Sequence, residues 1–419
     1  MRRCLNTRHA KGNGQMQKFI ALLIAICLAF AIFTGCNGTS ASDGTSVEDT
    51  APAESSAPSE EPAAEADEQP AAEIHSVDLE ALYASHEPDE VVASVDGSDI
   101  TWEEYYYFLS VQVQQIDNYF AQMASYYGET VNWDDEIDTD ATYEDIAVTN
   151  AESMLSQLIG IEKYAADNGV KLGSDDDEQL ASQLQSDIAT VCGDDATEEQ
   201  FDEAISGMHL TRELYDRMNR VNLLYSKGFK EKYGEDGELV SDKDAIKYLE
   251  DNGYLSAGHI LLMTIDPATG DALSDDEIAE KKATADKLAE ELKAIKDPEE
   301  LNKRFAELKE QYCEDTGKET YPDGYVFTEG TMVTEFEDTV KALEDNEVSE
   351  PVLSRYGYHI IIRLPLDADR TVSYTSDGSP VNARYLYASD KYTKDVQAGI
   401  DSLEVKQADG FDTVDIAGY

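Results

Sequence analysis

The sequence predicts an α+β protein, in which a mostly helical region is followed by a smaller region of mixed helices and strands. Two observations predict this class. Apolar residues recur at helical spacing behind several capping sequences between residues 101 and 251. Strand patterns and capped helices then alternate between residues 255 and 364. Because 419 residues exceed the size of one average domain, we expect more than one.

Residues 1–35 have the pattern of a lipoprotein signal peptide. They hold five basic residues and no acidic one, and an unbroken apolar run covers residues 19–33. This run is shorter than the roughly 20 residues that a membrane-spanning helix needs. It ends in a lipobox-like sequence, so we expect acylation (palmitate) at Cys36. The alternatives are an ordinary signal peptide, and Met16 instead of Met1 as the true start.

Residues 36–73 are predicted to form a disordered acidic tether. Residues 37–73 contain ten acidic side chains, no basic one and no aromatic one. Such a segment buries too little apolar surface to offset its ordering entropy. A lipid anchor followed by a solvated tether predicts a protein held at the extracytoplasmic face of a bacterial cell membrane.

The charge of the chain argues against several functions. It has 88 acidic and 32 basic side chains, a formal net charge of −56. Nucleic-acid binding needs clustered Lys and Arg, so we expect no nucleic-acid partner. Five scattered cysteines do not form a disulfide framework. The acidic runs at 133–136 and 175–178 lack the spacing of a calcium loop, so no metal site is expected. The oligomeric state is not indicated.

Residues 74–254 are predicted to form the mostly helical domain. A short strand at 91–95 precedes a tight turn at Asp96-Gly97. Thr101 and Glu104 form a capping box that opens a long helix, which ends near Tyr127. The remaining predicted helices cover 143–166, a segment from Ser174, a segment from Thr197, 211–233 and a segment from Ser241.

Residues 255–364 mix strands with helices. A buried strand at 256–263 contains His259. Two helices follow, the first opened by a capping box at Ser274 and the second by Asp297 with Pro298. The segments predicted after them are a strand holding Phe327, a helix at 333–343 and strands at 348–352 and 356–363.

The order and spacing of these segments resemble the parvulin family of peptidyl-prolyl isomerases. The matching pieces are the strand with His259, the pair Met332 and Phe336, the turn at 347–352 and the strand at 357–361. The wider layout resembles PrsA-type extracytoplasmic foldases. That resemblance implies that residues 365–419, with a helix at 385–403 and a strand at 411–416, complete the helical domain around an inserted parvulin-like α/β domain.

The resemblance also implies a site. It makes His259, Asp315 and His359 the catalytic residues, with the two histidines as a hydrogen-bonded pair on neighbouring strands. Met332 and Phe336, one helical turn apart, would hold the proline ring together with Phe327. Prolyl isomerisation needs no cofactor, because only the amide resonance has to be lost. The implied partners are unfolded exported proteins, whose X-Pro bonds the protein would isomerise.

One departure from the family leaves an alternative open. Where the family carries Gly-Gly-x-Leu-Gly, this chain has Tyr321-Pro322-Asp323-Gly324-Tyr325, so Gly324 stands where an apolar pocket wall is common. A holdase chaperone with a weak or inactive parvulin domain is therefore the alternative function. A solute-binding lipoprotein or surface adhesin is a third, although the chain has no run of alternating βα units.

Overall fold

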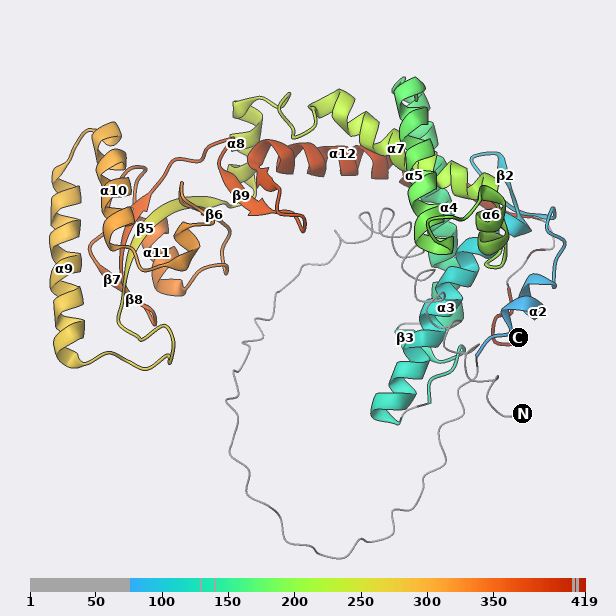
Figure 1. Ribbon diagram of the computed structural model, residues 1–419, viewed down its shortest axis with the longest axis horizontal. Helices are drawn as coiled ribbons and strands as arrows, with labels where there is room; N and C mark the ends of the chain where they lie inside the picture. Colours follow the sequence, from blue (N-terminus) through green and yellow to red (C-terminus); the bar gives the residue numbers. More distant parts are fainter. Residues whose placement is uncertain (1–75, 129, 139–140, 409–410, 412–413) are drawn as a thin grey trace, which may run out of the picture. The chain divides into compact units, whose positions relative to one another are not determined.

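The computed structural model describes residues 76–128, 130–138, 141–408, 411 and 414–419. The predicted signal peptide, Cys36 and the whole of the predicted tether at 36–73 lie outside the described residues. The mixture of helices and small sheets confirms the α+β class. Within the described ranges, no helix is long and apolar enough to cross a membrane. The chain divides into two compact units (Figure 1): unit 1 holds residues up to Lys227 together with Asp395–Tyr419, and unit 2 holds Gly228–Lys394.

Unit 1 contains a three-stranded sheet built from both ends of its sequence. Strand β1 (Val91–Val95) pairs antiparallel with β2 (Ser98–Thr101) across the predicted turn, where Gly97 has a φ of +84°. On its other side β1 pairs antiparallel with β11 (Val405–Gln407). The sheet therefore joins residues from the start and the end of the described chain.

Helices make up most of unit 1. Thr101 and Glu104 form the predicted capping box, which starts α3 (Trp102–Tyr127). Helix α4 (Tyr143–Asp167) packs against α3 (Figure 1). The other elements of this part of the chain are α2 (Leu79–Tyr83), β3 (Glu136–Asp138), β4 (Ala141–Thr142), α5 (Ser174–Cys192), α6 (Glu198–Ser206) and α7 (Arg212–Tyr233), which continues into unit 2.

The prediction of a strand at 411–416 is wrong for the described residues there, which are not in a strand. Phe411 is instead buried, with its ring 5.6 Å from that of Tyr105. The apolar pattern of this segment comes from core packing rather than from pairing in a sheet. The strand of this region is β11, which lies earlier in the sequence.

Unit 2 is built around a four-stranded sheet with the order β6-β5-β8-β7. The two long central strands pair antiparallel, with His259 of β5 opposite Ile361 of β8. Helices α9 and α10 pack against one face, and α11 packs against the other. The bounds are β5 (Leu255–Met263), α9 (Asp275–Ala294), α10 (Pro298–Tyr312), the 3-10 helix η1 (Thr316–Lys318), β6 (Tyr325–Phe327), α11 (Thr334–Ala342), β7 (Val352–Leu353) and β8 (Gly357–Arg363).

Two features of unit 2 differ from the sequence prediction. The strand expected at 348–352 is shorter and later, at β7, and Val348 makes only an isolated bridge to Ile362. A hairpin of β9 (Thr371–Tyr374) and β10 (Pro380–Asn382) lies in a stretch for which the sequence predicted no helix or strand. Helix α8 (Asp242–Asp251) and the first part of α12 (Ala383–Asp401) complete the unit.

Candidate functional site

A cavity of about 780 Å³ lies in unit 2 on the face of the sheet that carries α11. Five of the six predicted site residues line it: His259, Asp315, Met332, Phe336 and His359. The sixth, Phe327, is only 3% exposed and packs behind Phe336, with 5.8 Å between the ring centroids. Phe327 therefore supports the cavity wall without reaching the cavity.

The carboxylate of Asp315 is held by three donors. His259 Nε2 lies 2.9 Å from Asp315 Oδ2, and the hydroxyl of Tyr325 donates to the same oxygen at 2.6 Å. The backbone N–H of Gly317 donates to Oδ1 at 2.9 Å. The hydrogen bond from His259 is the main reason that the pKa of Asp315 is well below its usual range. The cavity therefore contains a fixed negative charge at neutral pH.

The two histidines have opposite pKa shifts. Burial disfavours the charged form of His259, but the hydrogen bond to Asp315, together with the neighbouring Cys313, outweighs burial and raises its pKa. Burial, and then the neighbouring charge of His259, lowers the pKa of His359 to about 4. At neutral pH His359 is therefore neutral, whereas the protonated form of His259 is favoured relative to a free imidazole.

The histidines do not form the expected direct hydrogen bond. Their rings meet edge to face, with centroids 5.2 Å apart and an interplanar angle of 71°. The Nε2 atom of His259 is taken by Asp315, and that of His359 lies 2.7 Å from the hydroxyl oxygen of Ser354. Both Nδ1 atoms are buried without a hydrogen-bond partner among the described residues. Asp315 and Ser354 thus orient the two histidine rings.

The apolar side of the cavity is fixed by α11. Phe336 is 2% exposed, and its ring lies 5.3 Å from that of His259. The buried carboxylate of Glu337 accepts hydrogen bonds from the backbone N–H of Met332 at 2.8 Å and of Gly330 at 3.1 Å. These bonds hold the loop before the helix, and so place Met332 next to Phe336.

Tyr325 is a cavity residue that the sequence analysis did not assign. Gly324 has a φ of +95°, and a Cβ there would lie 2.8 Å from the carbonyl oxygen of Ala257 in β5. The pocket wall is therefore provided by the next residue, Tyr325. Strand alternation could have identified it, because residues two apart in a strand, such as Tyr325 and Phe327, share a face. The other lining residues that were missed include Leu261, Met263, Thr316, Arg355 and Tyr356.

Comparison with known families places this site in a recognised domain. The family model of the PPIC-type PPIase domain (rotamase) matches residues 259–364. Foldase protein PrsA of Oceanobacillus iheyensis is 26% identical over 287 residues, which cover 68% of this chain and 71% of that relative. Foldase protein PrsA 1 of Bacillus cereus is 49% identical over 85 residues, 20% of this chain and 27% of the relative. Chaperone SurA of Chromohalobacter salexigens is 36% identical over 95 residues, 22% of this chain and 21% of the relative.

Among solved structures, the crystal structure of PrsA from Bacillus subtilis matches 75% of this chain and 91% of its own, with 21% identity and a TM-score of 0.23. The family match covers the segment that supplies each of the six predicted site residues. Residues 259–364 therefore match the PPIC-type peptidyl-prolyl isomerase (rotamase) domain, and the chain that carries them is similar to PrsA foldases.

Proposed function

We propose that this protein binds unfolded exported proteins outside the cell membrane and speeds the cis/trans isomerisation of their X-Pro bonds. The observation that carries the proposal is one cavity in which the apolar residues Met332 and Phe336 lie beside the hydrogen-bonded pair His259 and Asp315. The similarity to foldases and to a chaperone supports the same function.

The chemistry requires the site to favour a twisted amide over a planar one. Rotation of a prolyl bond must overcome a barrier of about 18–20 kcal/mol, which comes from amide resonance. Met332 and Phe336 would hold the proline ring while the preceding carbonyl turns past the polar wall of His259, Asp315 and His359. Because hydrogen bonds fix these groups in advance, they can stabilise the rotating amide without reorganising.

Removal of one apolar wall tests this function. We expect Met332→Ala to lower kcat/KM by about tenfold, which corresponds to about 1.4 kcal/mol of lost transition-state contact. The assay is protease-coupled isomerisation of an Ala-Pro peptide by the full chain. Met332 is better suited than the buried Phe336, whose truncation costs about 3–5 kcal/mol of stability. Leu353→Ala, which removes an exposed apolar side chain of β7, is the matched control.

The holdase alternative has an observation of its own. Tyr126 and Tyr127, at the end of α3 in unit 1, are 81% and 72% exposed. Exposed aromatic side chains of this kind can bind apolar segments of unfolded clients. If the wild-type protein isomerises no peptide yet prevents aggregation of a denatured client, the result contradicts the isomerase function and supports the holdase function.

We also propose that Cys36 is acylated and anchors the protein to the extracytoplasmic face of the membrane. The support is the apolar run at 19–33, the lipobox-like end and the acidic segment that follows. Metabolic labelling with a fatty-acid probe is expected to mark the wild-type protein and not Cys36→Ser. Equal labelling of both proteins would disprove the anchor.

A further inference from the structure

Three tyrosine side chains form a continuous row that leads out of the candidate site. The ring of Tyr325, which lines the cavity, lies 5.6 Å from that of His259 and 5.0 Å from that of Tyr321. Tyr321 in turn lies 5.7 Å from Tyr374 of β9, which is 40% exposed. We call Tyr325, Tyr321 and Tyr374 the tyrosine row. It connects the buried pair of histidines with the surface of the hairpin.

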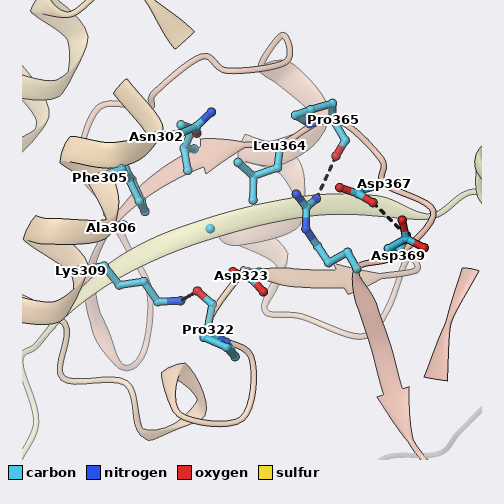
Figure 2. Close-up of a pocket in the computed structure, with 14 residues that line it drawn as sticks. Asn302, Phe305, Ala306, Lys309, Pro322, Asp323, Leu364, Pro365, Asp367 and Asp369 are labelled. Atoms are coloured by element: carbon cyan, nitrogen blue, oxygen red, sulfur yellow. Dashed lines mark hydrogen bonds between the residues drawn. The ribbon is translucent and has the colours of Figure 1, made fainter. Parts of the chain in front are cut away.

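Several contacts hold the row in place. The ammonium group of Lys309, in α10, donates to the backbone carbonyls of Tyr321 at 3.1 Å and Pro322 at 2.9 Å. Figure 2 shows Lys309 reaching Pro322 at the edge of a second cavity, of about 500 Å³, that lies over Gly258. Gly258 is the sequence neighbour of His259, so it faces the opposite side of the sheet. The loop that carries Tyr321 is thus fastened from behind the candidate site.

The hydroxyl groups of the tyrosines at both ends of the row already donate hydrogen bonds within the protein. Tyr325 donates to Asp315 at 2.6 Å, and Tyr374 donates to the carbonyl of Thr320 at 2.7 Å. Gly317 makes room for the first contact, because a Cβ at that position would lie 2.2 Å from the hydroxyl oxygen of Tyr325. With these hydroxyl groups occupied, the row offers a ligand mainly the faces and edges of its rings.

We propose that the tyrosine row is an extended subsite, which binds the client segment that flanks the isomerised prolyl bond. This proposal rests on the proposed isomerase function and adds a preference to it. Ring faces and edges pair with aromatic side chains, and the negative ring faces disfavour acidic ones. From Tyr325 to Tyr374 the row is long enough for about three residues of extended chain at roughly 3.3 Å per residue. The preferred clients carry an aromatic residue two to four positions from the proline.

The experiment compares two peptides with the full chain. One is a tetrapeptide with a central Ala-Pro bond, and the other is a ten-residue peptide with the same core and Phe three positions away on each side. Isomerisation is measured by NMR exchange, which needs no coupled protease, and affinity by fluorescence anisotropy. Tyr321→Ala and Tyr374→Ala are expected to raise KM and Kd for the long peptide about three- to tenfold. Values for the tetrapeptide, and kcat for both peptides, stay unchanged.

Two kinds of control make the result specific. Tyr321→Phe and Tyr374→Phe keep the rings and are expected to retain wild-type values, whereas Leu353→Ala removes an exposed apolar side chain elsewhere on the same unit and is expected to change nothing. Thermal melts of every variant exclude unfolding. If a Tyr374 variant does not fold, the Tyr321 pair decides the question alone.

The possible failures are distinguishable. An equal rise in KM and Kd for both peptides, or no rise for the long peptide, would overturn the proposed subsite. If the wild-type protein isomerises neither peptide, the proposed isomerase function fails, but the anisotropy measurement still decides whether the row binds the long peptide. Replacement of Phe by Asp in the long peptide is expected to abolish the difference between wild-type and Tyr321→Ala proteins. If the two proteins still differ with the Asp-containing peptide, the tyrosine rings do not select an aromatic side chain in the client.

Discussion

At the scale of single residues, the site depends on two histidine rings whose protonation is set in opposite directions. His259 shares a carboxylate with Tyr325, so its charged form is favoured, whereas burial keeps the 4%-exposed His359 neutral. Two adjacent imidazolium ions would repel each other in this buried site. The asymmetry allows one ring to carry charge while the other stays neutral near pH 7.

The depressed pKa of His359 predicts a loss of stability in mild acid. An unfolded histidine binds a proton near pH 6.5, but the folded ring does so only near pH 4. Between these values the unfolded state binds more protons, so the stability present above pH 6.5 is lost as the pH falls toward 4. The difference between the folded and unfolded pKa values corresponds to roughly 3 kcal/mol of unfolding free energy. The opposite shift of His259 acts above pH 6.5 and does not overlap this window.

The measurement compares wild-type protein with His359→Gln, because the many carboxylates titrate in both. The difference between their unfolding free energies should shrink by roughly 3 kcal/mol from pH 7 to pH 4. The only two tryptophans, Trp102 and Trp133, are in unit 1, so their fluorescence does not report on this site. Hydrogen exchange of the β5 and β8 amides follows it instead. Parallel pH profiles for the two proteins would contradict the burial argument.

At the scale of elements, local sequence signals were enough to predict the helices. The features that the sequence did not predict depend on contacts between distant residues. The capping residues Thr101, Thr197 and Ser274 start helices where expected, because a cap is an interaction within a few residues. The β9–β10 hairpin was missed because its few residues carry too little apolar periodicity. Tyr325 was not predicted because the family pattern places the pocket wall at Gly324. Only the backbone conformation shows which residue faces the cavity.

The contact between α4 and the end of α12 predicts opposite effects for two glycines. A Cβ at Gly160 would lie 2.4 Å from Ile400 Cγ1, so Gly160→Ala should cost about 1–3 kcal/mol of stability in unit 1. A Cβ at Gly399, in α12, would meet nothing within 4 Å. Gly399→Ala is therefore expected to stabilise the unit by about 0.5–1 kcal/mol. Urea unfolding followed by tryptophan fluorescence measures both, and equal effects would refute the close-packing account.

At the scale of the whole molecule, unit 2 interrupts the sequence of unit 1. The predicted domain, 255–364, is shorter than unit 2, and its boundaries remain a prediction. Val326 of β6 packs in a cluster with Val240, Ala368 and Ala383, all outside that window. The parvulin fold thus shares a core with segments on both sides of it in the sequence.

This shared core predicts a ranking of fragments. A fragment of residues 255–364 should melt cooperatively, since its sheet and three main helices are complete within it. A fragment of residues 228–394 should melt at a higher temperature, because it keeps the partners of Val326. Calorimetry of the two fragments tests the ranking. Equal melting temperatures would show that this cluster adds nothing, and a shorter fragment without a transition would move the domain boundary outward.

The pairing of β1 with β11 has a consequence for how the chain matures. If the chain is exported from its N-terminus, as we propose, β1 crosses the membrane early but meets β11 only after every residue of unit 2 has followed. The entropy lost on closing so long a loop is reduced if the intervening segment has already become compact. Unit 2 can thus reach its native state first and bring the two strands together. A protein proposed to assist the folding of exported chains would then complete its own first sheet last.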